Sequence, residues 1–249
     1  MKKLVATLAC RNQGTRLYGK PLQNLDIKNK LTILEHQINL IKTIPSIEDI
    51  VLGISEGSDN SCYYDYAKKN KIKYITGSEE DVLKRLILCL EEVGGTDAFR
   101  ITTESPFICY EPIEEAWERH KNRELDFSYL DNVPDGCGFE IIALDTLKIS
   151  HFNGQAKHRS ELCSLYIREH KADFKTEYID VPDSIRRLDI RLTVDYPEDL
   201  IVCRSVYQKF SNLAPKIPLQ SIIEYLDLNP YLKDLVEPFI DEGLKTMNI

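Results

Sequence analysis

The chain has 249 residues, which is long enough for one large domain or two small ones with a substantial core. Hydrophobic residues make up 43% and charged residues 29%, a composition that excludes disordered, collagen-like and coiled-coil proteins. Its 32 basic and 40 acidic side chains give a net charge of −8, which argues against a nucleic-acid-binding protein. A small anionic substrate stays compatible with that charge, because a few arginines in one pocket outweigh the global sign locally.

Seven scattered cysteines and the absence of any long apolar run indicate the compartment. No C-x-x-C pair occurs, so neither a disulfide framework nor a zinc site is expected, and a reducing environment fits best. The apolar run 4–9 is shorter than the ~7–15 residues of a signal-peptide core. No stretch approaches the ~18 apolar residues of a membrane span. We therefore expect a cytoplasmic protein with no membrane partner.

Strand-like and helical patterns alternate through the first half of the chain. The run 4–9 predicts a short buried strand, and a polar, glycine-containing loop follows at 10–20. The pattern then predicts helices at 31–42, 60–69, 79–93 and 111–121, alternating with strands at 50–54, 73–75 and 97–102. Such alternation is typical of βαβ units, so we expect an α/β fold whose mostly parallel sheet carries helices on both faces.

This regular alternation ends after about residue 125. Strands are expected at 139–144, 175–181 and 187–194, with helices near 160–170 and at 197–210. Four prolines beyond residue 211 indicate short helices packed outside the sheet. The prediction is one domain over residues 1–210 with an inserted arm at roughly 130–185, followed by a helical tail at 211–249.

The loop after the first strand carries the first functional signal. It leaves the carboxyl end of that strand, which is where open α/β sheets bind ligands. Gly14 and Gly19 allow backbone N–H groups to approach a ligand, and three cations lie in the same loop, namely Arg11, Arg16 and Lys20. These groups suit a polyphosphate. The loop alone is equally compatible with a basic, solvated segment.

A P-loop is one alternative for this segment. The spacing Gly14-x-x-x-x-Gly19-Lys20 matches most of that motif, but Pro21 follows where Ser or Thr should hold Mg²⁺. Proline also lacks the N–H that a P-loop directs at phosphate. The dinucleotide fingerprint G-x-G-x-x-G is absent as well. The sequence therefore disfavours a P-loop kinase and a Rossmann dehydrogenase.

Residues 10–22 resemble the signature loop of the cytidylyltransferase family that includes CMP-KDO and CMP-sialic acid synthetases. Within this family they are most similar to the spore-coat polysaccharide branch. Four further segments resemble its other motifs in the same order: 77–83, 100–106, 134–140 and 191–199. Five ordered motifs over roughly 3–210 are far more specific than any one. The resemblance implies a Rossmann-like nucleotidyltransferase domain whose inserted arm mediates a homodimer.

The resemblance also implies the reaction. An acceptor oxygen would attack the α-phosphorus of CTP, and pyrophosphate would leave. Arg11, Arg16 and Lys20 match the residues that hold the triphosphate and stabilise the departing pyrophosphate. Mg²⁺ would be bound by two carboxylates, Glu104 and Asp195, and would polarise the α-phosphate. The partners would be CTP and a small anionic or hydroxylated acceptor.

Further site residues are carried over from the same motifs. Nucleotide contacts are expected from the loop, the second motif and the third motif: Gly14, Thr15, Ser78, Glu80, Asp81 and Arg100. Acceptor contacts are expected from Asp135, Glu140 and Glu161. Two alternatives remain open, because Asp195 could cap the following helix and residues 78–81 could simply begin one.

Two departures from the family pattern bear on function. Thr103-Glu104 stands where relatives have Gly-Asp, and the longer glutamate would move its carboxylate by about 1.5 Å. Relatives often have a histidine after the residue that matches Glu161, whereas Leu162 stands here. The first hypothesis is a Mg²⁺-dependent cytidylyltransferase that transfers CMP from CTP to an acidic sugar or a phosphorylated sugar or polyol for surface-glycan synthesis. The alternatives are a nucleotide-binding regulatory module that has lost turnover, or an enzyme that uses another nucleotide.

Overall fold

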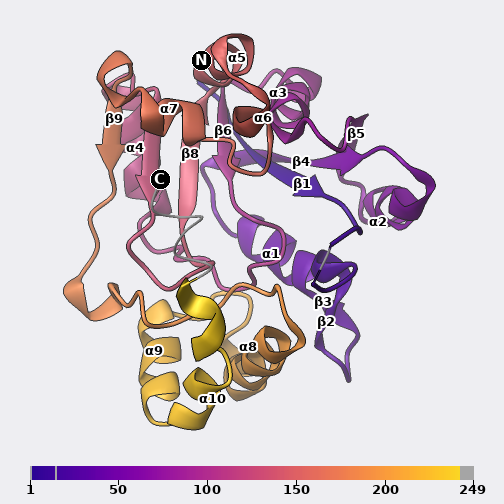
Figure 1. The fold of residues 1–249 in the computed structure, drawn as a ribbon, viewed down its shortest axis with the longest axis vertical. Helices are drawn as coiled ribbons and strands as arrows, with labels where there is room; N and C mark the ends of the chain where they lie inside the picture. The colour runs from indigo at the N-terminus through magenta and orange to yellow at the C-terminus, as the bar shows by residue number, and fades with distance from the viewer. Residues whose placement is uncertain (1, 15, 242–249) are drawn as a thin grey trace.

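The computed structural model describes residues 2–14 and 16–241, which contain a seven-stranded sheet flanked by helices (Figure 1). The strand order is β5-β4-β1-β6-β8-β7-β9. Strand β8 pairs antiparallel with β6 and β7, and the other pairings in this sheet are parallel. The strands are β1 (Leu4–Cys10), β4 (Ile47–Ser55), β5 (Lys73–Gly77), β6 (Asp97–Arg100), β7 (Phe127–Leu130), β8 (Phe139–Ala143) and β9 (Thr176–Tyr178). A mostly parallel α/β sheet is confirmed.

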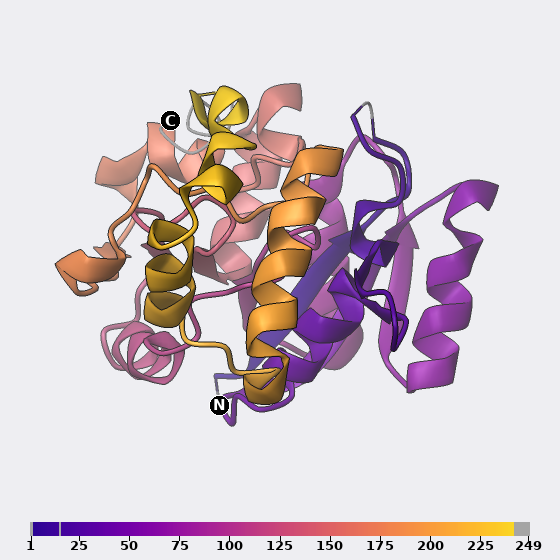
Figure 2. The ribbon, with the colours of Figure 1, turned by 90° about the horizontal axis from the view of Figure 1, so that it is seen from below.

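Helices cover both faces of this sheet. They are α1 (Ile33–Ile41), α2 (Ser61–Asn70), α3 (Val82–Val93), α4 (Ile113–Asn122), α5 (Leu144–Asn153), α6 (Ala156–Arg159), α7 (Leu165–Glu169), α8 (Pro197–Phe210), α9 (Leu219–Asp227) and α10 (Pro230–Asp234). Helices α8 and α9 lie next to each other on one side (Figures 1 and 2). A small antiparallel pair, β2 (Asn24–Asp26) and β3 (Leu31–Thr32), precedes α1.

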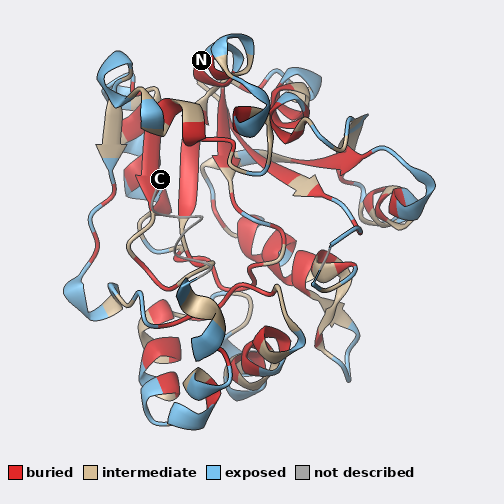
Figure 3. Ribbon diagram, viewed as in Figure 1, coloured by how far each residue is buried: buried red, intermediate tan, exposed pale blue. Residues whose placement is uncertain are grey.

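The core divides into two clusters because strand side chains alternate between faces. On β1, Leu4, Ala6 and Leu8 pack into the cluster with α1 and α8. Val5, between them, packs into the other cluster with α3 and α5. Figure 3 shows the resulting pattern of buried central strands and helices whose outer turns are exposed. No helix within residues 2–14 or 16–241 is both long and apolar enough to span a bilayer.

Helix α3 illustrates how local sequence sets an element's bounds. The helix was expected from residue 79, but it begins at Val82 because the Asp81 carboxylate caps it by accepting from Lys84 N–H at 2.9 Å. It ends at Gly94, which adopts φ of 65°, a left-handed conformation that glycine tolerates best. The stripe of Leu83, Leu86 and Leu90 faces the sheet, as the helical spacing predicted.

The second half of the chain differs from expectation in several places. Residues 187–194 form no strand; they make a single parallel bridge between Arg191 and Asp135. Their backbone bonds go to two separate loops, Leu192 N–H to Asp135 and Val194 N–H to Glu104, so no continuous ladder develops. Of the helix expected near 160–170, only α7 forms within that range, and β7, α5 and α6 were not predicted.

The predicted domain division is not tested by this architecture. Residues 130–185 supply β8 and β9 to the main sheet, and α9 of the tail shares a core with α8. Residues 242–249 of the predicted tail lie outside the described residues. The boundary at residue 210 and the arm's role in a homodimer stay predictions.

Candidate active site

The candidate site lies at the carboxyl end of β1, where the sheet order changes direction. The chain moves outward from β1 to β4 and β5, then returns to β6 on the other side of β1. Such a switch point leaves a crevice beyond the strand ends, which is where open α/β sheets bind ligands. The loop after β1 and the segment after β6 form the two walls of this crevice.

The loop after β1 is held open by specific contacts. A Cβ on Gly14 would lie 2.7 Å from the carbonyl oxygen of Leu17, so only glycine fits there. Gly19, at φ of 60°, donates its N–H to the carbonyl oxygen of Asn12 at 2.8 Å. Buried Asn12 in turn donates its backbone N–H to Asn60 Oδ1 at 2.8 Å. Thr15 lies outside the described residues, so its nucleotide contact stays a prediction.

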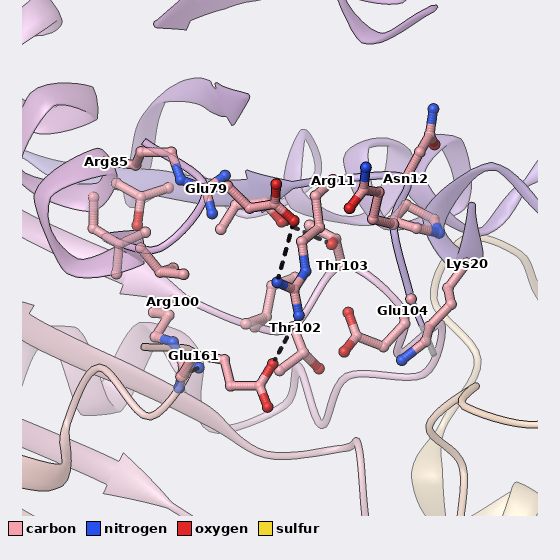
Figure 4. A pocket seen from close by; sticks show the side chains of 18 of the residues that line it. Arg11, Asn12, Lys20, Glu79, Arg85, Arg100, Thr102, Thr103, Glu104 and Glu161 are labelled. Atoms are coloured by element: carbon pink, nitrogen blue, oxygen red, sulfur yellow. Dashed lines mark hydrogen bonds and ion pairs between the residues drawn. The ribbon is translucent and has the colours of Figure 1, made fainter. Parts of the chain in front are cut away.

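Two adjoining cavities occupy the crevice. The larger has a volume of about 550 Å³ and lies between the loop, the start of α3 and the end of β6 (Figure 4). The smaller, about 230 Å³, extends toward β8, α7 and residues 191–195. The two share several predicted residues, namely Arg16, Lys20, Arg100, Glu104 and Glu161. Arg11 and Gly14 line only the first, whereas Asp135, Glu140 and Asp195 line only the second.

Asp195 is surrounded by cations. Its Oδ1 lies 2.5 Å from Lys20 Nζ and 3.2 Å from Arg16 Nη2, and its Oδ2 accepts from Arg191 Nη2 at 2.7 Å. Burial alone would raise the pKa of this carboxyl, but the Lys20 hydrogen bond and the surrounding positive charge lower it below its usual range. Asp195 is therefore ionised, and it joins the loop after β1 to the segment before α8.

Glu104, in the segment after β6, faces one of these cations, Lys20 (Figure 4). The Glu104 carbonyl oxygen accepts from Val194 N–H at 3.1 Å, which holds the backbone beside the residue before Asp195. Burial raises the pKa of the Glu104 carboxyl, Lys20 opposes that shift, and the charge of Asp195 adds to it. Figure 4 shows the Glu104 carboxylate beside the Lys20 ammonium at one end of the larger cavity.

Two carboxylates suit a Mg²⁺ ion that also binds water and substrate phosphates, and they are too few for a metal held by protein ligands alone. Within the described residues, no group of three or more Asp, Glu, His or Cys side chains could hold a metal ion. Magnesium ordinarily takes one or two protein carboxylates and completes its octahedron with water and substrate phosphates. Glu104 and Asp195 supply that kind of oxygen donor, and burial raises the pKa of the Glu104 carboxyl although Lys20 opposes the shift.

Arg191 organises the acidic wall. Its side chain is 1% exposed and donates to three carboxylates: Asp199 from Nε at 2.8 Å, Asp135 from Nη1 at 2.6 Å and Asp195 from Nη2 at 2.7 Å. Asp199 also accepts from the N–H groups of Asp195 and Tyr196 at 2.8 and 2.9 Å. Asp199, not Asp195, therefore stabilises the start of α8, so the capping alternative for Asp195 is wrong.

The smaller cavity contains a second buried ionic cluster. Glu140 is 7% exposed and accepts from Arg100 Nη1 at 2.7 Å, Ser164 Oγ at 2.6 Å and Arg168 Nη2 at 3.1 Å. Burial would raise the pKa of Glu140, but the two guanidinium groups outweigh burial and lower it to about 2. Glu161 lines both cavities, and its Oε2 lies 3.3 Å from Nη2 of Arg11, which lines the larger one (Figure 4).

Comparison with known proteins identifies the family. A sequence model described as cytidylyltransferase matches residues 6–226. The chain belongs to the cytidylyltransferase family. It is 28% identical to the spore coat polysaccharide biosynthesis protein SpsF of Bacillus subtilis (strain 168) over 92% of this chain and 96% of that protein. The expected resemblance is thereby confirmed, and the protein is a nucleotidyltransferase enzyme.

Solved structures show the same fold at low identity. A cytidylyltransferase from Leptospira borgpetersenii superposes with a TM-score of 0.83 and 21% identity, covering 93% of this chain and 97% of that one. A CMP:2-keto-3-deoxy-manno-octonic acid synthetase solved with CTP superposes with a TM-score of 0.63 and 14% identity, covering 84% and 99%. The nucleotidyltransferase fold of this cytidylyltransferase is therefore confirmed.

Three predicted nucleotide contacts of the cytidylyltransferase lie away from the cavities. The described linings include Glu79 and Val82 but not Ser78, Glu80 or Asp81. Ser78 Oγ accepts from Glu80 N–H at 3.2 Å, and Asp81 caps α3 and pairs with His151 at 2.8 Å. These contacts match the alternative in which residues 78–81 begin a helix, and the nucleotide role of the three residues stays a prediction.

Several residues of the site were not predicted, namely Asn12, Arg85, Arg168 and the anchoring roles of Arg191 and Asp199. Arg85 left a signal, because it follows Val82 by three residues and precedes Cys89 by four, on the apolar stripe of α3. The sequence signal for Arg191 was weaker: it is the one charged residue in the segment Arg-Leu-Thr-Val, residues 191–194. Nothing local marked Asn12, whose partners are 47 and 48 residues away.

Proposed function

We propose that this cytidylyltransferase transfers CMP from CTP to an acceptor oxygen in a Mg²⁺-dependent reaction that releases pyrophosphate. The observation that carries the proposal is the meeting of Lys20 and Arg16 with Asp195 at the glycine-containing loop, beside Glu104. Phosphoryl-transfer sites need positioned cations and a divalent-ion site more than they need a covalent nucleophile. The cations Arg16 and Lys20 and the carboxylates Glu104 and Asp195 all line the smaller cavity, which supports the proposal.

Each residue has a defined task in this scheme. Backbone N–H groups of the loop and the cations Arg16 and Lys20 hold the triphosphate and neutralise the charge of the leaving pyrophosphate. Glu104 and Asp195 would hold Mg²⁺, which polarises the α-phosphate when bound. The acceptor oxygen forms a bond to the α-phosphorus, the bond to the bridging oxygen of pyrophosphate breaks, and the acceptor's proton leaves to solvent.

The acceptor is proposed to be an acidic sugar or a phosphorylated sugar or polyol. The smaller cavity, about 230 Å³, adjoins the loop end of the larger one, and its lining combines Arg100, Arg168 and Asp135. Such a lining offers both guanidinium donors and carboxylate acceptors, which suits a group rich in hydroxyls with at least one anionic centre. The name of SpsF, which refers to spore coat polysaccharide biosynthesis, supports an activated precursor of a surface glycan as the product.

The test is a turnover assay with a panel of acceptors. The protein is incubated with CTP, Mg²⁺, pyrophosphatase and either acidic sugars or phosphorylated sugars and polyols, and phosphate release is measured. ATP, GTP and UTP replace CTP in parallel, which tests the alternative that another nucleotide is used. Release with CTP and one acceptor class is expected. Absence of release with every acceptor, combined with no CTP binding by calorimetry, would refute the proposal.

A homodimer is proposed as the assembly. Within residues 130–185, Ile149 and Phe152 of α5 are 44% and 85% exposed, so an apolar surface is available on this segment. Light scattering after size exclusion should give twice the mass of one chain. A monomer at all concentrations up to about 100 µM would contradict the proposed assembly and leave the proposed reaction untouched, since the described cavities are built by one chain.

A further inference from the structure

Arg85 on α3 is an unusual residue for its position. It is 1% exposed, which places it among the largest fully buried side chains of the protein. Its side chain nevertheless lines the larger cavity. Figure 4 shows its guanidinium directed toward the cavity from the side opposite Lys20 and Glu104. A buried guanidinium costs free energy unless a partner compensates its charge.

The other cations that line this cavity have carboxylate partners. Arg11 pairs with Glu79 and Glu161, whereas Arg16 and Lys20 pair with Asp195 and Arg100 pairs with Glu140. Within the described residues, no carboxylate forms an ion pair with Arg85. Its positive charge therefore remains uncompensated by the protein, and the cavity is the direction from which a ligand could compensate it.

The protein builds a dedicated space for this side chain. Gly53 of β4 pairs with Ile75 of β5, two residues before Gly77, so the two glycines lie diagonally across adjacent strands and both face Arg85. The missing side chain of Gly77 makes room for the Arg85 stem. A Cβ on Gly77 would lie 2.9 Å from Arg85 Cγ, and one on Gly53 would lie 3.4 Å from Arg85 Cβ.

The guanidinium of Arg85 is only partly satisfied within the protein. Its Nη1 donates to the carbonyl oxygens of Gly53 at 2.8 Å and Cys10 at 3.3 Å. Its Nε is buried without a hydrogen-bond partner. Backbone contacts thus fix the orientation of the guanidinium and leave donor capacity that is not used.

The surroundings of Arg85 indicate which part of a nucleotide it meets. The phosphate-binding groups Arg16 and Lys20 lie with Glu104 at the other end of the cavity (Figure 4). Near Arg85 the lining includes side chains of α3 and the end of β1 that are apolar, namely Val82, Leu86 and Ala9. An apolar wall with one donor group suits a flat heterocyclic base. In the proposed function the phosphates occupy the Lys20 end of the cavity, which would direct the base toward Arg85.

We propose that Arg85 determines the specificity of this enzyme for cytosine over uracil. The inference rests on the proposed use of CTP. Cytosine presents two adjacent acceptors, O2 and N3, to a donor, whereas uracil carries a proton on N3. A guanidinium has only donors, so it can pair with both cytosine acceptors but must oppose the N3–H of uracil. A donor left opposite another donor in a buried site strongly penalises the wrong ligand.

The test compares CTP with UTP in matched variants. Arg85→Lys keeps the charge but removes the planar fork, and Arg85→Met keeps the stem but removes the donors. Lys84→Met is the control, because Lys84 is the exposed neighbour on the same helix and lines neither cavity. Dissociation constants for both nucleotides come from calorimetry, and kcat/KM values come from the pyrophosphate assay.

We expect the wild-type chain and Lys84→Met to prefer CTP over UTP by at least about tenfold. Both Arg85 variants should lose about tenfold or more of that preference, mainly through weaker CTP binding. Equal weakening of CTP and UTP, with an unchanged ratio, would mean that Arg85 only holds the loop and would overturn the inference. No preference in the wild-type chain would overturn it as well.

Two further outcomes remain decisive. If circular dichroism shows that the Arg85 variants do not fold, Gly77→Ala takes their place, since its Cβ displaces the Arg85 stem without lining the cavity. A reduced CTP preference in Gly77→Ala supports the inference, and an unchanged preference refutes it. Absence of CTP binding by the wild-type chain refutes the proposed function itself, whereas CTP binding with unchanged discrimination in the variants refutes the role of Arg85 alone.

Discussion

Lys20 and Asp195 are separated by 175 residues in the chain, yet Lys20 Nζ lies 2.5 Å from Asp195 Oδ1. The contact joins the loop after β1 to the segment before α8, two segments that are far apart in the sequence. Arg16 contacts the same oxygen at 3.2 Å. In the proposed reaction, triphosphate oxygens would compete with Asp195 for Lys20 and Arg16, and Mg²⁺ would compete with these two cations for Asp195.

Removing either partner should therefore abolish most turnover. Lys20→Ala and Asp195→Asn are each expected to lower kcat/KM by about 100-fold or more, the scale of losing one transition-state stabiliser. Steady-state pyrophosphate release measures the effect. Asp65→Asn, an exposed aspartate on α2, is the matched control and should be unaffected. A near-normal rate in Asp195→Asn would mean that Asp195 is not a ligand of the proposed metal site.

Glu104 should control the Mg²⁺ requirement. Its raised pKa reflects burial beside Asp195, so a bound cation would relieve unfavourable charge there. We expect Glu104→Gln to raise the Mg²⁺ concentration for half-maximal rate by about tenfold or more, and EDTA to stop turnover of the wild-type chain. Glu104→Asp should retain activity.

The Glu104 variants also separate the leading hypothesis from the regulatory one. If the wild-type chain binds CTP without turnover and Glu104→Asp gains activity, the chain is a nucleotide-binding module that has lost catalysis. If Glu104→Gln shows an unchanged Mg²⁺ requirement, the metal does not bind at Glu104. Calorimetric titration of CTP measures whether the wild-type chain binds the nucleotide. Repeating it with and without Mg²⁺ for Glu104→Gln measures whether the metal still strengthens CTP binding.

The sequence predicted best what depends on neighbouring residues. The loop cations Arg11 and Lys20 lie in one short motif that directly follows a buried strand, so their joint placement could be inferred. The parallel half of the sheet was equally predictable, because β1 and residues 50–54 of β4 are mostly apolar runs, and amphipathic helices follow them in the chain. The placement of these cations and of the parallel strands follows from local periodicity and from the positions of the strand ends, without reference to contacts between distant segments.

What escaped prediction depends on contacts between distant segments. Residues 187–194 were expected to form a strand. Instead, the Arg191 side chain pairs with three carboxylates, and the backbone N–H groups of this segment donate to two separate loops. Strand β7 is a short buried segment whose partner, β8, follows an irregular turn that no local pattern marks. The nucleotide roles of Ser78 and Asp81 stay predictions, because a helix start and an anion-binding turn have similar composition.

Glu140 should make the free energy of unfolding decrease as the pH falls into the acid range. Its pKa is lowered from 4.5 to about 2 in the folded chain. Because the folded pKa lies below the unfolded one, its contribution is fully present above about pH 4.5 and is lost as the pH falls toward 2. The free energy of unfolding should differ between the wild-type chain and Glu140→Gln by roughly 3 kcal/mol more at pH 6 than at pH 2.

Denaturant unfolding at several pH values measures this difference. Glu118→Gln is the matched control, since Glu118 is exposed on α4, and its difference from the wild-type chain should hardly change with pH. A constant difference between the wild-type chain and Glu140→Gln across the range from pH 6 to pH 2 would contradict the charged cluster of Glu140, Arg100 and Arg168.

The cysteines provide a test of the packing. All seven are free, and six of them are buried. Burial raises the thiol pKa of Cys163 to about 11 and that of Cys10 to about 12, which suppresses the reactive thiolate. We expect a thiol reagent to modify Cys62 alone rapidly in the native protein and all seven thiols after denaturation without reductant. Fewer than seven in the denatured protein would reveal a disulfide.

Asp199 should stabilise the acidic wall without touching substrate. Its fully buried carboxylate accepts from Arg191 and from the N–H groups of Asp195 and Tyr196, so Asp199→Ala leaves part of a buried guanidinium and two N–H groups without acceptors. We expect a loss of about 3–5 kcal/mol in the free energy of unfolding, together with a lower kcat/KM because Asp195 loses its fixed position. Glu198→Ala, in the same helical turn, should cost less than about 1 kcal/mol, since only its interaction with the helix dipole is lost. Equal losses in the two variants, measured by chemical unfolding, would mean that helix electrostatics rather than the Arg191 cluster holds this wall.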